Sequence, residues 1–299
     1  MNTVLAELGR RYVERWVAVL VLPGLLYVAG AVAAHRLGHA HWADVGRLAG
    51  LLDPGGPLGG GRTSLWVLAF VVLPVLSAAA GLAARGAAAA LGRLWFDPWP
   101  YGLRRLARRR TAARAKRWRA ADRAYLAELE GSGARPPAEA RARIDALAAR
   151  RNAVALGPPG HPTWTGDRLG AVGARVWAWY RLDVVFAWPR LWLVLEESEQ
   201  NALRAARAEL DTAVTLAGWG VLGLLPAVWW WPAPLVAAGV FAVGLRRTRA
   251  AVDTLAHLTE AAFDLRAAVL ARELGFDVPE GRLSPETGAQ VTAHLRKHV

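Results

Sequence analysis

Residues 198–231 read SEQNALRAARAELDTAVTLAGWGVLGLLPAVWWW, and this stretch decides how the rest of the chain is interpreted. Its first part is polar and charged, whereas residues 212–231 contain no charged residue and end in three tryptophans. About 20 apolar residues are needed to cross the hydrocarbon core of a membrane, and tryptophans gather at its interfaces. The stretch therefore predicts a helix that rises from a water-exposed stalk into a membrane span at 212–231.

Three further apolar segments lack charged residues, namely 16–34, 65–84 and 233–245. The last is short, about 20 Å of helix at 1.5 Å per residue, so Arg246 and Arg247 must extend toward the headgroups to complete it. We therefore predict an all-α polytopic membrane protein with four transmembrane helices. Basic residues before segment 16–34 also fit a cleaved export signal, which is an alternative for that segment.

The composition excludes several classes of site. The chain has no cysteine, so it has no disulfide scaffold, thiol nucleophile or Cys-based metal site. It carries 37 Lys and Arg against 24 Asp and Glu, a net charge of +13. In a membrane protein such an excess is first a signal of orientation and of contact with anionic lipid.

The basic residues are distributed unevenly, which predicts the topology. Twelve of them lie between residues 85 and 123, where only Asp97 and Asp122 are acidic, whereas the loop 35–62 has three arginines. Because cytoplasmic loops are enriched in Lys and Arg, we expect both termini to be cytoplasmic in the cell membrane. The expected order is an amphipathic N-terminal segment (1–15), an extracellular loop (35–64), a basic helical cytoplasmic domain (85–211) and cytoplasmic C-terminal helices (246–299).

The cytoplasmic segments are predicted to be helical. Residues 103–130 favour a long polar helix that stops at a Gly-Ser-Gly turn, and a second helix is expected from Pro136 to about Val154. Residues 166–187 predict an aromatic-rich helix, and 176–195 are expected to lie in the domain interior or at the inner headgroup surface. The fourth span is predicted to continue as a helix to Leu274, and Ser284 starts a short final helix.

Three prolines are candidates for hinges or gates. Pro23, Pro74 and Pro226 each follow a tryptophan by seven or eight residues and are each preceded by leucine. A proline removes one helical hydrogen bond and can kink a span. The alternative is ordinary packing, because proline is frequent in membrane helices.

Three histidines cluster in the predicted extracellular loop: His35, His39 and His41. Imidazoles at this spacing can bind zinc or copper or respond to external pH. The alternative is a polar loop whose histidines have no joint role.

The arginines next to the spans predict contact with anions. Arg104, Arg105, Arg108 and Arg109 follow the second span, and Arg246 and Arg247 follow the fourth. They are expected to bind anionic lipid or to form a basic cytoplasmic mouth. Nucleic acid is disfavoured, because Trp118 and Tyr125 do not make a convincing stacking platform.

Other motifs favour no enzyme. Asp167 and Arg168, in TWTGDR at 163–168, form either a binding element or a helix-start turn. No Ser/His/Asp set, HExxH, paired carboxylates or nucleotide fingerprint is evident, so neither catalysis nor a cofactor is expected.

The layout resembles that of uncharacterised four-span integral membrane proteins of GC-rich Gram-positive bacteria. The resemblance is carried by GDRLGAVGARV (166–176), WPRLWLVL (188–195) and WGVLGLLPAVWWWPA (219–233). It implies a fold and a location, and no activity.

Three functions follow as hypotheses. The first is a homo-oligomeric channel that favours anions, with a cytoplasmic regulatory domain. The second is a membrane-anchored adaptor that binds a cytoplasmic protein. The third is a lipid- or metabolite-handling membrane enzyme or transporter.

Overall fold

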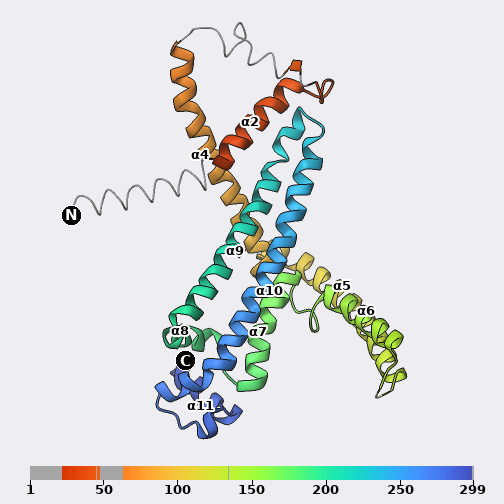
Figure 1. Cartoon of the computed structure of the whole chain (residues 1–299), viewed down its shortest axis with the longest axis vertical. Coiled ribbons are helices and arrows are strands. Elements are labelled where there is room, and N and C mark those ends of the chain that lie inside the picture. The colour runs from red at the N-terminus through yellow and green to blue at the C-terminus, as the bar shows by residue number, and fades with distance from the viewer. Residues whose placement is uncertain (1–21, 45, 48–62, 134, 298–299) are drawn as a thin grey trace, which may run out of the picture. The chain divides into compact units, whose positions relative to one another are not determined.

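The computed structural model describes residues 22–44, 46–47, 63–133 and 135–297, and every regular element within them is a helix (Figure 1). The predicted all-α class is therefore confirmed for this part of the chain. The segment 1–15 and Trp16 lie outside the described residues. The α-helices are α2 (Leu22–Leu37), α4 (Thr63–Phe96), α5 (Arg104–Gly131), α6 (Ala138–Val154), α7 (Trp164–Tyr180), α8 (Val184–Val194), α9 (Glu197–Leu222), α10 (Ala233–Glu273) and α11 (Pro285–Arg296). Short 3-10 helices are η2 (Tyr101–Leu103), η3 (Leu225–Val228) and η4 (Pro279–Gly281).

The chain divides into two compact units, which are described separately. Unit 1 comprises residues 1–91 and 212–246, and unit 2 comprises 92–211 and 247–299. Three helices, α4, α9 and α10, contribute residues to both units.

Unit 1 is packed through small residues, as is usual where helices approach closely in a membrane. A Cβ atom on Gly24 would lie 2.1 Å from the carbonyl oxygen of Ser77, so α2 touches α4 backbone to backbone. A Cβ on Gly218 would lie 2.4 Å from the carbonyl oxygen of Ala84, which brings α9 equally close to α4. The tyrosine hydroxyl of Tyr27 donates to the carbonyl of Leu222 at 3.1 Å and joins α2 to the end of α9.

Two described helices are long and apolar enough to cross a membrane, Phe70–Phe96 and Glu197–Val228. The outer surface of α4 carries exposed apolar side chains, among them Phe70 (83% exposed) and Val75 (62%). A surface of this kind is typical of contact with lipid or with another protein. These features support a membrane protein, whereas the number of spans and their orientation remain predictions.

The helix predicted through residues 212–231 ends earlier than expected. Helix α9 stops at Leu222, a turn follows, and η3 contains Pro226 near its start. Proline lacks the amide hydrogen that a continuing α-helix needs, so the chain turns before the three tryptophans. Near this turn the indole of Trp230 donates to the carbonyl of Trp42 at 3.0 Å.

Unit 2 contains a hydrophobic core built from α7, α8, α10, α11 and the start of α9. Phe263 and Leu191 are fully buried in it. The long helix α10 ends as predicted, because Gly275 adopts φ +83°, the left-handed conformation of a helix C-terminus. The final helix α11 begins at the predicted cap, where the Ser284 hydroxyl accepts from the Thr287 amide.

The prediction of one helix over 166–187 was wrong, because the chain breaks at 181–183 between α7 and α8. Arg181 adopts φ 53° and ends α7, and the Asp183 carboxylate caps α8 by accepting from the Val185 amide. Pro189 lies inside α8 and does not end it. The break lets the two short helices cover different faces of the core.

Candidate functional site

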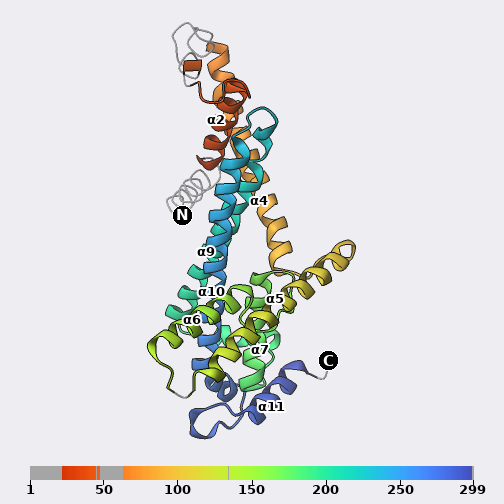
Figure 2. The same ribbon diagram turned by 90° about the vertical axis from the view of Figure 1, so that its right-hand side faces the viewer.

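The most polar part of unit 2 is a helical hairpin formed by α5 and α6, which lie side by side (Figures 1 and 2). Helix α5 is rich in alanine and arginine, both strong helix formers, and the turn uses Gly133 at φ +66°. Two ion pairs join the helices, Arg143 with Glu128 at 2.8 Å and Arg151 with Asp122 at 3.3 Å. The predicted pair of helices is therefore confirmed, with bounds within one or two residues of those expected.

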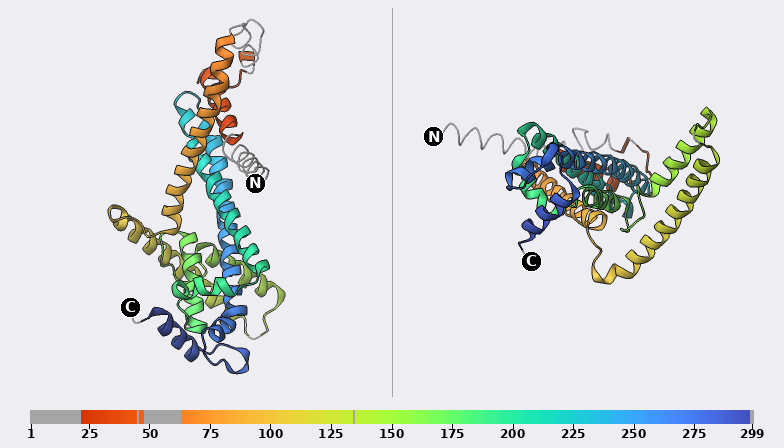
Figure 3. Two further views of the ribbon diagram at one scale, coloured as in Figure 1. Left: turned by 90° about the vertical axis from the view of Figure 1, so that its left-hand side faces the viewer. Right: turned by 90° about the horizontal axis from the view of Figure 1, so that it is seen from below.

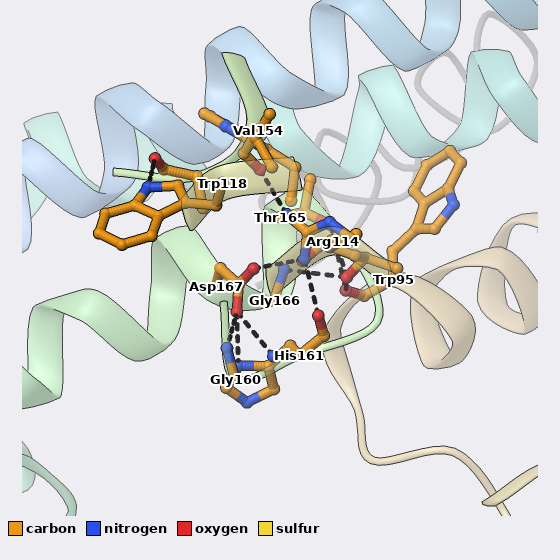
Figure 4. A network of polar contacts seen from close by, with 12 residues as sticks. Trp95, Arg114, Trp118, Val154, Gly160, His161, Thr165, Gly166 and Asp167 are labelled. Carbon is orange, nitrogen blue, oxygen red and sulfur yellow. Dashed lines mark hydrogen bonds and ion pairs between the residues drawn. The ribbon is translucent and has the colours of Figure 1, made fainter. Parts of the chain in front are cut away.

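Arg114 clamps the base of this hairpin to the start of α7 (Figure 4). Its guanidinium donates to the carbonyls of Val154 (2.5 Å), His161 (2.6 Å) and Thr163 (2.9 Å), and it pairs with the carboxylate of Asp167. Both side chains of the ion pair are largely buried, at 13% and 9% exposed. Arginine suits this role because its planar group offers five donors in a fixed fork.

Asp167 extends the clamp to the loop before α7 (Figure 4). Its Oδ1 accepts from the amides of Gly160 (2.8 Å) and His161 (2.7 Å). The hydroxyls of Thr163 and Thr165 donate to the carbonyl of Trp95, at 2.6 and 3.1 Å. One network thus fixes the start of α7, the loop and the hairpin base.

The outward face of α5 carries a row of cations, which we call the basic ridge. Its members are separated by three, four or seven residues along the helix, apart from one adjacent pair, so they lie on one side of it. The row extends over about 27 Å at 1.5 Å per residue. All members are exposed, and none has a carboxylate partner among the described residues: Arg105, Arg108, Arg109, Lys116, Arg119 and Arg123.

The two aromatic residues of α5 lie on the face opposite the basic ridge. The indole of Trp118 donates to the carbonyl of Ala155 at 2.9 Å, and the ring of Tyr125 lies 4.4 Å from the guanidinium carbon of Arg151. Both are therefore part of the hairpin interior, and the basic ridge presents charge without aromatic rings.

The predicted arginines lie on two different helices. Arg104, Arg105, Arg108 and Arg109 form the first turns of α5, and Arg104 stacks on Tyr101 with 3.7 Å between guanidinium carbon and ring centre. Arg246 and Arg247 are exposed on α10. The ridge continues the first group along α5 to Arg123.

The three prolines occupy different settings. Pro23 is the second described residue of α2 and is half-buried, Pro74 is exposed inside α4, and Pro226 is buried in η3. Only Pro74 is therefore interior to a described α-helix on both sides. A hinge role for any of them stays a prediction.

The histidines do not converge. The ring of His35 packs edge-on against Trp229 with centroids 5.8 Å apart, and His41 is 3.3 Å from the guanidinium of Arg47. Within residues 22–44, 46–47, 63–133 and 135–297, no group of three His, Asp or Glu side chains is arranged to hold a metal ion.

Sequence reasoning missed the environment of Arg168. This side chain is 1% exposed and pairs with Asp253 at 2.6 Å and Glu260 at 2.8 Å on α10. Arg175 pairs with the second oxygen of Glu260 at 2.7 Å. Of the two interpretations of TWTGDR, a binding element or a helix-start turn, the helix-start turn is confirmed, because the Thr163 hydroxyl caps α7 and Asp167 lies in its first turn. Arg168 joins α7 to α10.

Comparison with models of known protein families, with curated proteins and with solved structures found no match for this chain. The resemblance to four-span membrane proteins therefore stays a prediction, and function has to be argued from the site alone.

Proposed function

We propose that this protein is a multi-pass membrane protein that works as an adaptor, and that its basic ridge binds an acidic surface of a cytoplasmic protein. The observation that supports the proposal is a row of six exposed cations on a helix whose base is clamped by Arg114. A rigid arm with unpaired charge is preorganised for a partner, because little freedom is lost on binding.

The character of α5 favours an acidic protein over a bilayer. A helix that lies on a membrane needs a broad apolar face, whereas α5 has no buried residue and is polar on most of its surface. Figure 3 (right) shows the hairpin extending away from the other helices of unit 2. Nucleic acid is less well matched, because single strands are bound by stacking on aromatic rings and Trp118 and Tyr125 are engaged inside the hairpin.

The test places a photo-crosslinking amino acid at Ala112, which is exposed between the cations of the ridge. In native membranes we expect a covalent product with an acidic protein segment. The variant Arg108→Gln/Arg119→Gln should lower its yield about tenfold, the effect of losing roughly 1.4 kcal/mol of binding. Added salt should lower the yield as well, since exposed charges are screened.

A matched control removes two charges from the other side of the same helix. Arg110→Gln/Arg117→Gln should leave the yield near that of the unmodified chain. Equal losses in both variants, or a product that contains lipid or nucleic acid, would overturn the proposal.

The homo-oligomeric, anion-favouring channel is the second candidate, and the exposed apolar surface of α4 favours it. That surface is suited to contact with a second copy as well as with lipid. Reconstitution in vesicles would test it: chloride flux together with a closed ring of subunits is the expected result. A strictly monomeric protein without flux would exclude the channel.

A further inference from the structure

A cavity of about 730 Å³ lies within unit 2, between α7, α8, α9 and α10. Its size falls in the range of small-molecule sites, roughly 300–1,000 Å³. The walls are apolar over most of their area and include the side chains of Val172, Trp188, Trp192, Leu203 and Leu255. A cavity of this kind accepts a hydrocarbon chain.

Glycine on α7 leaves open space beside the cavity at one position, Gly173. Gly170 and Gly173 both line it, and a Cβ atom on Gly173 would meet no other atom within 4 Å. The space beside Gly173 is therefore open, and a larger side chain there would occupy it without displacing the backbone.

The charged residues of the cavity lining all lie on α9: Arg204, Arg207 and Asp211. Arg207 pairs with Asp211 at 3.4 Å, so its charge is largely offset. Arg204 instead donates to the neutral amide oxygens of Asn201 and Gln200, both at 2.8 Å, and lies 5.3 Å from the ring centre of Trp192. Among the residues that the structure describes, Arg204 is thus the cation of the cavity lining without a carboxylate partner.

We propose that this cavity binds an acyl chain of an anionic phospholipid from the bilayer, with the headgroup phosphate at Arg204. Arginine is well suited to phosphate, to which it donates in a bidentate manner. The bilayer is the source because Asp211, on the cavity rim, is directly followed by Thr212, where the apolar part of α9 begins. The inference rests on the proposed membrane location and is independent of the basic ridge.

The experiment uses the full chain in phosphatidylcholine vesicles that contain phosphatidylglycerol with a photoreactive diazirine in one acyl chain. Crosslinked peptides are identified by mass spectrometry, and we expect label on residues of α8 and α9 that line the cavity. Gly173→Leu should lower this labelling about tenfold, because the leucine side chain fills the space. Ala178→Leu, an exposed position on the same helix outside the cavity lining, is the matched control and should label like the unmodified chain.

The role of Arg204 in binding the headgroup phosphate is tested with Arg204→Gln. Arg204 is exposed, so the substitution leaves the apolar walls of the cavity intact. It should reduce labelling by the phosphatidylglycerol probe while leaving weak labelling by a phosphatidylcholine probe unchanged. Equal labelling by the two probes in the unmodified chain, or no effect of Gly173→Leu, would overturn the inference.

Displacement of the probe by free hexadecanoate alone would also overturn it, since the ligand would then be a fatty acid from solution. The Arg108→Gln/Arg119→Gln variant should keep full cavity labelling, which separates a failure of this inference from a failure of the adaptor proposal.

Discussion

At Gly288, α11 packs directly against the backbone at the end of α7. A Cβ atom there would lie 1.7 Å from the carbonyl oxygen of Tyr180, which is closer than any side chain can approach. Two hydrogen bonds flank this contact, because the Thr292 hydroxyl donates to the Arg181 carbonyl at 2.8 Å and accepts from the Asp183 amide at 3.1 Å. The docking of α11 therefore depends on a residue without a side chain.

We predict that Gly288→Ala loosens α11. Overpacking of a tight contact costs about 1–3 kcal/mol, so amide hydrogen exchange in residues 285–296 should become about 10- to 100-fold faster. Gly86→Ala is the control, because a Cβ on Gly86 in α4 meets nothing within 4 Å. Unchanged exchange in α11 would show that the helix shifts to accept the methyl group at no cost.

Arg168 shows where residue-level prediction from sequence ends. Its partners Asp253 and Glu260 are 85 and 92 residues away, and nothing local distinguishes it from the exposed arginines of the basic ridge. A buried arginine is recognisable only when the tertiary fold has placed a carboxylate against it. The basic ridge, in contrast, could be predicted from the sequence, because its cations belong to one helix and their spacing places them on one face of it.

At the scale of elements, α8 and α11 are joined by one carboxylate. Oδ1 of Asp183 accepts from the Val185 amide at 3.0 Å and caps α8, while Oδ2 accepts from Arg296 of α11 at 2.6 Å. The hydrogen bond from Arg296, helped by the Val185 amide, lowers the pKa of Asp183 below its usual 3.8. The ionised form therefore stabilises the contact between the two helices.

The lowered pKa of Asp183 determines whether acid strengthens or weakens the contact between α8 and α11. Because the pKa is lowered in the folded chain, the stabilisation is complete above pH 3.8 and is lost as the pH falls through the lowered pKa. We predict that exchange protection of α11, corrected for intrinsic rates, falls in this acid range. Asp183→Asn should show reduced protection already at neutral pH and little further change on acidification. If acid lowered the protection of α11 equally in the unmodified chain and in Asp183→Asn, the loss would be due to other carboxylates.

Helix ends explain most of the remaining differences between sequence and structure. The ends at Gly131, Gly275 and Ser284 were predictable, because glycine and serine have a defined role at helix termini. The break at 181–183 was not, since Arg181 is a residue that rarely adopts positive φ, and only the packing of α7 and α8 on one core holds it there. The apolar run 184–194 reads equally as a continued helix.

For the whole molecule, the absence of cysteine allows a direct test of topology. Single-cysteine variants at Ala40, in the turn after α2, and at Ala120, on α5, introduce one reactive thiol each at exposed positions. The uneven distribution of arginine predicts that Ala40→Cys reacts with a membrane-impermeant maleimide in intact cells. Ala120→Cys should react only after the membrane is permeabilised. Labelling of both in intact cells, or of neither, would contradict the predicted orientation.

Because Arg114 fixes the base of the hairpin, the rest of the hairpin forms an arm that is held at one end. The arm from Arg114 to Gly131 is about 26 Å long at 1.5 Å per residue, and its fulcrum is one guanidinium with three carbonyls and one carboxylate. The ridge cations on this arm are Lys116, Arg119 and Arg123. Asp167, which pairs with Arg114, is covalently next to Arg168, the residue that ties α7 to α10. A force applied to the arm would therefore reach α10, the longest of the described helices, through two consecutive residues, Asp167 and Arg168.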